Sequence, residues 1–158
     1  TLIIGAGAVG TGHGVTSAIA LGCDLVSIGT LFIPTVESNA QDEYKNMIAS
    51  GAKESNSAPF VPIVYTDKIS GIPANFMEES LNKAGIDINE VKSKTKDEFK
   101  TAHEFDEAKA WRDVWSAGHS IVNINKIDTV SNVVQKLKAE IMESKKHVSQ
   151  ALFPSSKI

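Results

Sequence analysis

Three glycines near the start of the chain, Gly5, Gly7 and Gly10, have the spacing GxGxxG directly after an apolar run. Glycines at this spacing let backbone amides approach a phosphate group at the start of a helix. A dinucleotide fingerprint also requires an acidic residue at the end of the second strand, about 20 residues further on. The second apolar run ends instead at Gly29-Thr30. The glycine spacing alone therefore leaves open a Rossmann site or another kind of phosphate site.

A second small turn, Gly29-Thr30, follows the next apolar run at residues 25–28. When two consecutive parallel strands each end in such a turn, both turns lie at the same carboxyl edge of the sheet. There they can hold one phosphate monoester, as the last two strands of a (β/α)8 barrel do. The pattern favours this barrel site over a Rossmann site.

The elements that position these turns are a strand, a glycine loop, a helix and a second strand within residues 1–30. The helix is expected over 12–21, and Gly22 provides its C-terminal stop. The two strands should be parallel neighbours. The further elements expected are strands at 61–66 and 121–124 and helices at 36–50, at 108–117 and from an Asp128 cap to a frayed tail that starts at Lys145.

Composition excludes several classes of function. The chain has 158 residues and a net charge of −3, which gives no reason to expect nucleic acid or an anionic membrane as partner. No apolar run is long enough to predict a transmembrane helix. The single cysteine, Cys23, favours a reducing compartment. Because the chain starts at Thr1 inside an apolar strand-like run, we expect it to be the C-terminal part of a longer protein.

Several segments occur in an order typical of one family. They are AGAV (6–9), AIALG (18–22), IGT (28–30), SGIPANF (70–76), AGID (84–87) and KAWRDVWSAG (109–118). In this order they resemble the nitronate monooxygenase family, formerly called 2-nitropropane dioxygenase, whose usual motifs are an Ala-Gly-Gly-Ile turn, ALALGAD, Met-Gly-Thr-Arg-Phe, TGxxxNxL and KAWRDxWxxGQG. The resemblance extends up to Glu143.

The resemblance implies an α/β fold, the C-terminal part of a (β/α)8 TIM barrel with a helical excursion. It also implies that the amides of Gly7 and Ala8 hold one side of an FMN phosphate. Those of Gly29 and Thr30 hold the other side, the Thr30 hydroxyl can assist, and His119 is a candidate flavin contact. The implied reaction is oxidation of an alkyl nitronate by flavin and dioxygen to a carbonyl compound and nitrite.

Four features depart from the family pattern. Ala8 replaces the second glycine of the turn, which is costly if its φ must be positive. Leu31 replaces the usual Arg, and His119 stands where Gln is common. The catalytic His of the family lies upstream of this segment, so no catalytic residue is expected within this chain. The other histidines, His13, His103 and His147, are expected to be solvated, and no metal-ligand spacing is present.

The resemblance also suggests an organisation. We expect the last two βα units of the barrel in 1–50, a helical or irregular excursion in 51–118, a closing helix in 119–145 and a flexible tail in 146–158. The expected partners are a nitronate, dioxygen, the N-terminal part of the barrel and a second copy in a homodimer. We expect a cytoplasmic location, with peroxisomal import as the alternative because Ser156-Lys157-Ile158 is similar to a Ser-Lys-Leu address.

Three other functions stay open at this point. A flavin-dependent enoyl-acyl-carrier-protein reductase shares this phosphate site, although the KAWRDVW stretch favours the monooxygenase. A small NAD-binding Rossmann module would need an acid at residue 29 or 30, and neither residue is acidic. A non-catalytic half-barrel that binds a phosphate-bearing ligand without turnover is a further interpretation.

Overall fold

The first elements form a unit in which a helix connects two parallel strands. The computed structural model describes residues 1–50, 53–54, 59–60, 62–102 and 112–153. Strand β1 (Ile4–Ala6) pairs in parallel with β2 (Leu25–Ser27), with Ile4 opposite Leu25 and Ala6 opposite Ser27. Helix α1 (Gly12–Ala20) connects them. The predicted βαβ unit is confirmed.

Local signals set the limits of α1. The Thr11 side chain accepts a hydrogen bond of 3.1 Å from the Gly14 amide and so caps the first turn. At the other end Gly22 has a φ of +103°, the left-handed conformation that ends helices. The predicted helix over 12–21 is confirmed, with Leu21 as its C-terminal cap.

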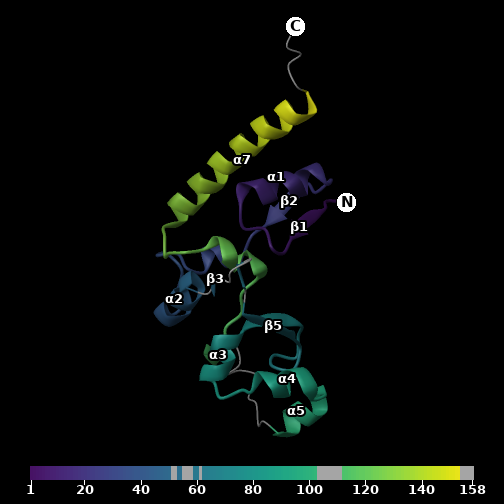
Figure 1. Cartoon of the computed structure of the whole chain (residues 1–158), viewed down its shortest axis with the longest axis vertical. Coiled ribbons are helices and arrows are strands. Elements are labelled where there is room, and N and C mark those ends of the chain that lie inside the picture. Colours follow the sequence, from purple (N-terminus) through teal and green to yellow (C-terminus); the bar gives the residue numbers. More distant parts are fainter. Residues whose placement is uncertain (51–52, 55–58, 61, 103–111, 154–158) are drawn as a thin grey trace.

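A long last helix, α7 (Val130–Leu152), lies alongside α1, as Figure 1 shows. Its N-cap is Thr129, whose hydroxyl accepts from the Asn132 amide, so the prediction of Asp128 as the cap is wrong. The Asp128 carboxylate instead accepts from the Thr129 amide and the Asn132 side chain. The helix also continues past Lys145, where we expected a frayed tail, because neither Gly nor Pro interrupts it before Leu152.

Between β2 and the excursion lie η1 (Thr30–Phe32) and α2 (Asp42–Ser50). The helix predicted over 36–50 begins only at Asp42, because Val36 donates its amide to the Asp128 carbonyl. Leu31, which replaces the arginine of the family pattern, is buried. The core around it consists of Leu31, Met47, Ile48, Met77, Trp115, Ala117, Ile121 and Ile124.

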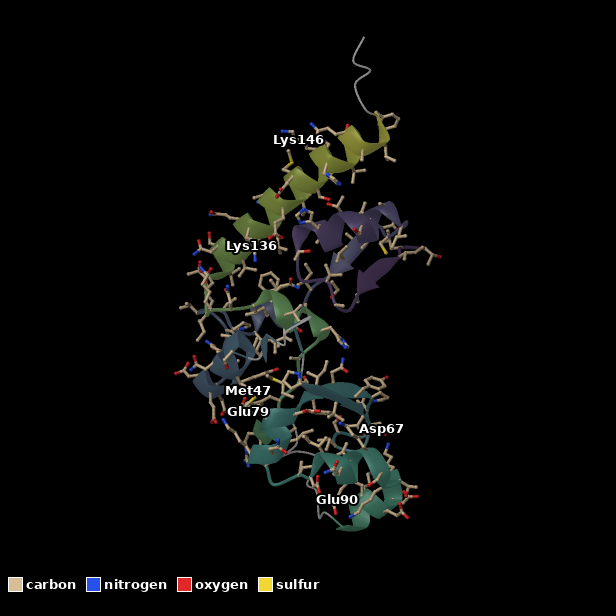
Figure 2. The ribbon with its side chains drawn as sticks, in the orientation of Figure 1. Met47, Asp67, Glu79, Glu90, Lys136 and Lys146 are labelled. Atoms are coloured by element: carbon tan, nitrogen blue, oxygen red, sulfur yellow. The ribbon has the colours of Figure 1, made fainter. Side chains whose placement is uncertain are left out.

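Residues 62–102 of the excursion form most of a separate core and lie at the end of the molecule opposite to β1 and α1 (Figure 1). Within its described residues the excursion contains two antiparallel hairpins and several short helices, and Figure 2 labels Asp67 and Glu90 in it. Its elements are β3 (Lys53–Glu54), β4 (Pro59–Phe60), β5 (Ile63–Thr66), β6 (Ala74–Met77), α3 (Glu78–Lys83), α4 (Ile88–Ser93) and α5 (Lys96–Ala102). Its core consists of Val64, Ile69, Phe76, Leu81, Ile86, Val91, Phe99 and Val114.

In the second half of the chain, two further predictions differ from the structure. The helix expected over 108–117 does not reach its predicted end, because Ser116 bridges Phe76 of β6 and the Ala117 amide donates to the Asn75 carbonyl. Its first residues, 108–111, lie outside the described part. The strand expected at 121–124 is wrong, because these residues belong to a short 3-10 helix, η2 (His119–Asn123), and its cap. The strand expected at 61–66 is present from Ile63 to Thr66.

One face of the sheet formed by β1 and β2 is uncovered, whereas Gly5 and Val26 on the other face are half-buried and Gly5 lies against Ala18 of α1. Leu2 is 71% exposed, Ile4 57% and Leu25 52%. All sheets within the described residues are two-stranded, so these residues do not by themselves close a barrel. Parallel strands are normally covered on both faces, and an apolar two-stranded parallel sheet has little stability alone.

Candidate functional site

The two turns singled out in the sequence follow directly from paired strand ends. Ala6 lies opposite Ser27, so Gly7 and Ala8 leave β1 beside the point where the chain leaves β2 for Gly29 and Thr30. Neighbouring strands lie about 4.8 Å apart, which brings the two turns to one edge of the sheet. All four of these residues are exposed or half-buried.

The first turn has an unusual backbone. Gly7 has a φ of +89° and Ala8 a φ of +57°. Glycine adopts a positive φ at no steric cost, whereas the Cβ of Ala8 meets the following carbonyl. The positive φ that would make alanine costly in the turn is therefore present, and the turn is held in a strained conformation.

The backbone amides at this edge are available to a ligand. In the described part of the chain, no hydrogen bond is donated by the amides of Ala8, Gly29 or Thr30. An added Cβ at Gly7 or Gly29 would meet no heavy atom within 4 Å, so space lies open beside both turns. Free amides next to open space suit a phosphate, whose oxygens accept hydrogen bonds from them.

A distant segment, η2 with the residue before it, packs against the second turn at Thr30 and against Gly10 of the glycine loop. The Gly118 amide donates to the Thr30 hydroxyl at 3.0 Å, 88 positions along the chain. A Cβ at Gly10 would lie 2.4 Å from the Asn123 side-chain nitrogen and 2.8 Å from the Ser120 Cβ. The structure thereby places η2, which begins with the exposed His119, beside the glycine loop.

The Thr30 hydroxyl has a role that the sequence did not indicate. It accepts from Gly118, and a hydroxyl that accepts one hydrogen bond still has a proton to donate. It can therefore fix η2 and contact an anion at the same time. Sequence reasoning missed Gly118, Ser120 and Asn123 as neighbours of the loop, because no short-range spacing connects them to it.

The start of α1 is occupied by an acidic residue from α7. The Gly12 amide donates to Glu140 Oε2 at 2.7 Å, and the Gly14 amide is capped by Thr11. In a Rossmann unit the pyrophosphate binds at this helix start. A carboxylate already held there disfavours the dinucleotide reading. Glu140 was not identified from the sequence, in which it is one of several acids on a charged helix face.

Tyr44 and Trp115 hold the segment that leads into η2. Their rings stack with centroids 5.2 Å apart and 16° between the planes, and the Tyr44 hydroxyl donates to the Ser116 carbonyl. The Trp115 amide donates to the Ser80 hydroxyl. Burial raises the pKa of Tyr44 above its ordinary value. Trp115 packs in the core, while Trp111 lies outside the described residues.

Two of the remaining histidines, His13 and His147, lie in the described part of the chain. His13 and His147 are exposed, as expected for solvated side chains, and His103 lies outside the described residues. Within the described ranges no group of three or more His, Cys, Asp or Glu side chains could hold a metal ion. None of the helices described has the length and apolar character needed to cross a membrane.

Comparisons with known proteins agree with the arrangement of these elements. The family model described as nitronate monooxygenase matches residues 2–140. FabK from Thermotoga maritima is similar in structure with a TM-score of 0.68 and 24% identity, covering 95% of this chain and 47% of that chain. A nitroalkane oxidase from Streptomyces ansochromogenes has a TM-score of 0.64 and 18% identity, covering 94% and 41%. The search of curated proteins found no match.

The shared segment is only part of each of these proteins, and the sequence identities are low. The chain spans less than half the length of the two solved structures named above. At identities of 18% and 24%, the two structural similarities show a shared fold and no more.

Proposed function

The chain belongs to the nitronate monooxygenase family, and from this premise we propose that it is the phosphate-binding, C-terminal part of an FMN-dependent nitronate monooxygenase. The observation that carries this proposal is the pair of turns at the adjoining ends of β1 and β2, with free amides and open space. The family membership supports a flavin-type oxidoreductase. The two turns lie at one edge of the β1–β2 sheet, where they can hold one phosphate monoester such as that of FMN.

The residues of this chain bind and orient the cofactor. The amides of Gly7 and Ala8 hold one side of the phosphate, and those of Gly29 and Thr30 hold the other. The Thr30 hydroxyl adds a donor, and His119 contacts the flavin from η2. The chemistry that FMN supplies when bound is electron transfer between a nitronate and dioxygen, with a carbonyl compound and nitrite as products.

The rest of the active site comes from an N-terminal part of the barrel. The exposed apolar side chains Leu2, Ile4 and Leu25 support this proposal, because further strands and helices would cover them. The solved structures are also more than twice as long as the segment that they share with this chain. The catalytic base is proposed to lie in that part.

The second candidate is a flavin-dependent enoyl-acyl-carrier-protein reductase. The structural similarity extends both to FabK and to a nitroalkane oxidase, with TM-scores of 0.68 and 0.64, so the fold alone does not favour either activity. The KAWRDVWSAG stretch supports the monooxygenase. The two candidates differ in their electron donor, which is the nitronate itself in one case and a reduced nicotinamide nucleotide in the other.

The test uses the full protein together with the N-terminal part of the barrel proposed above. It should be yellow and release FMN on denaturation. Anaerobic mixing with propyl nitronate should bleach the visible flavin absorbance, and admission of dioxygen should restore it with formation of nitrite. A protein without flavin, or one bleached by NADH with an enoyl thioester as acceptor but not by nitronate, would overturn the monooxygenase proposal.

A further inference from the structure

We infer that Glu140 restricts the flavin site to a mononucleotide, because its carboxylate occupies the position where a second phosphate would bind. This inference rests on the proposed function and concerns which flavin the same site accepts. FMN ends at one phosphate, whereas FAD continues through a second phosphate to an adenosine. A residue that blocks the second phosphate therefore selects between them.

The position of Glu140 is defined by a contact with α1. Its Oε2 accepts the Gly12 amide at 2.7 Å, and this amide is the first of the helix. The Thr11 hydroxyl accepts the Gly14 amide. Two of the first three amides of α1 thus have acceptors from within the protein, and one of these acceptors is charged.

The glycine loop leads from the phosphate turn directly to this helix start. Only Val9, Gly10 and Thr11 separate Ala8 from Gly12. In loops with the GxGxxG spacing a pyrophosphate binds where the helix amides begin. A second phosphate extending from the strand ends along this loop would meet the Glu140 carboxylate, and two anions competing for the same donor repel each other.

The packing between α1 and α7 prevents the carboxylate from moving aside together with its helix. A Cβ at Gly12 would lie 2.4 Å from the Leu137 carbonyl oxygen and 2.6 Å from the Ile141 nitrogen, so the two helix backbones are in close contact here. Lys136, labelled on α7 in Figure 2, approaches the other carboxylate oxygen at 3.8 Å. The lysine side chain is 56% exposed, so water weakens its effect on the carboxylate.

The experiment measures the dissociation constants of FMN and FAD by quenching of flavin fluorescence. It compares the full protein, prepared as in the test of the proposed function, with its Glu140→Ala and Glu140→Gln variants. The glutamine keeps an oxygen that can accept from Gly12 and removes the charge. Glu143→Ala is the matched control, because Glu143 is an exposed acid on the same helix. Circular dichroism checks that each variant is folded.

We expect the unmodified protein and Glu143→Ala to prefer FMN. Glu140→Gln should shift the FAD-to-FMN affinity ratio toward FAD by roughly tenfold, as expected when one close like charge is removed. Glu140→Ala should shift it at least as far if it folds. An equal loss of both affinities would mean a purely structural role and would overturn the inference. An unmodified protein that binds neither flavin would contradict the proposed function itself.

Discussion

The Thr30 hydroxyl accepts a hydrogen bond of 3.0 Å from the amide of Gly118, which lies 88 positions later in the chain. This contact joins the end of β2 to the segment that carries His119. It makes the geometry of the proposed phosphate site depend on a distant part of the chain, and it can be tested with small changes at Thr30.

Replacement of Thr30 by Val removes the hydroxyl with almost no change in shape. The Gly118 amide then loses its acceptor, and we expect a loss in unfolding free energy of about 1 kcal/mol. FMN affinity should fall roughly tenfold, because η2 and a phosphate donor are both affected. Urea unfolding and flavin titration measure the two effects. Thr30→Ser keeps the hydroxyl and should retain most of the stability and most of the FMN affinity. Equal losses in the two variants would contradict a role for the Thr30 hydroxyl.

Ala8→Gly should stabilise the protein by up to about 1 kcal/mol, because glycine adopts a φ of +57° without the steric cost that alanine has. The gain is limited by the greater freedom of glycine in the unfolded chain. Thermal unfolding measures it. Ala8→Val, which places a branched side chain in the same conformation, should lower stability. If both variants unfolded at the same temperature as the unmodified protein, the turn would not be strained.

Two neighbouring glycines in α1 should respond in opposite ways to the same substitution. Gly12→Ala places a Cβ within 2.4 Å of the Leu137 carbonyl oxygen, and we expect a loss of about 1–3 kcal/mol. Gly14→Ala meets nothing closer than 3.4 Å and should gain up to about 1 kcal/mol from helix propensity. Denaturant unfolding of the pair tests the close packing of α1 on α7. A Gly12→Ala variant as stable as Gly14→Ala would refute that packing.

Asp128 should make the protein more sensitive to acid. Hydrogen bonds from Lys126, Asn132 and the Thr129 amide lower the pKa of Asp128 from 3.8 to about 2. Because the folded pKa is the lower one, the stabilisation is fully present above about pH 4 and is lost as the pH falls toward 2. In urea titrations between pH 5 and pH 2, Asp128→Asn should lose less stability than the unmodified protein. Parallel losses in both would contradict this role.

Tyr44→Phe keeps the ring stacked on Trp115 and removes the hydrogen bond to the Ser116 carbonyl. We expect a loss of about 1 kcal/mol in unfolding free energy. Tyr44→Leu removes the stacking as well and should cost more. Unfolding followed by circular dichroism measures both. If Phe and Leu at this position had the same effect, the ring contact would contribute nothing.

The sequence was sufficient for the elements whose signals are local. The apolar runs, the glycine spacing and the stop at Gly22 predict β1, α1 and β2 with their parallel pairing, because periodicity and turn chemistry act over a few residues. The ordered motifs indicate the family, and the family model matches residues 2–140. The same local signals place Gly7, Ala8, Gly29 and Thr30 at the ends of adjacent strands.

Only the tertiary structure decided the contacts between distant segments. Asp128 is of a residue type that is common at helix N-caps, yet Thr129 is the residue that caps α7. The segment 121–124, which was expected to be a strand, belongs to η2 and its cap, and η2 packs against Gly10. Glu140 resembles any exposed acid of an amphipathic helix until α7 packs on α1 and brings it to the Gly12 amide. Such contacts depend on how whole elements pack, and no pattern of neighbouring residues encodes a hydrogen bond across most of the chain.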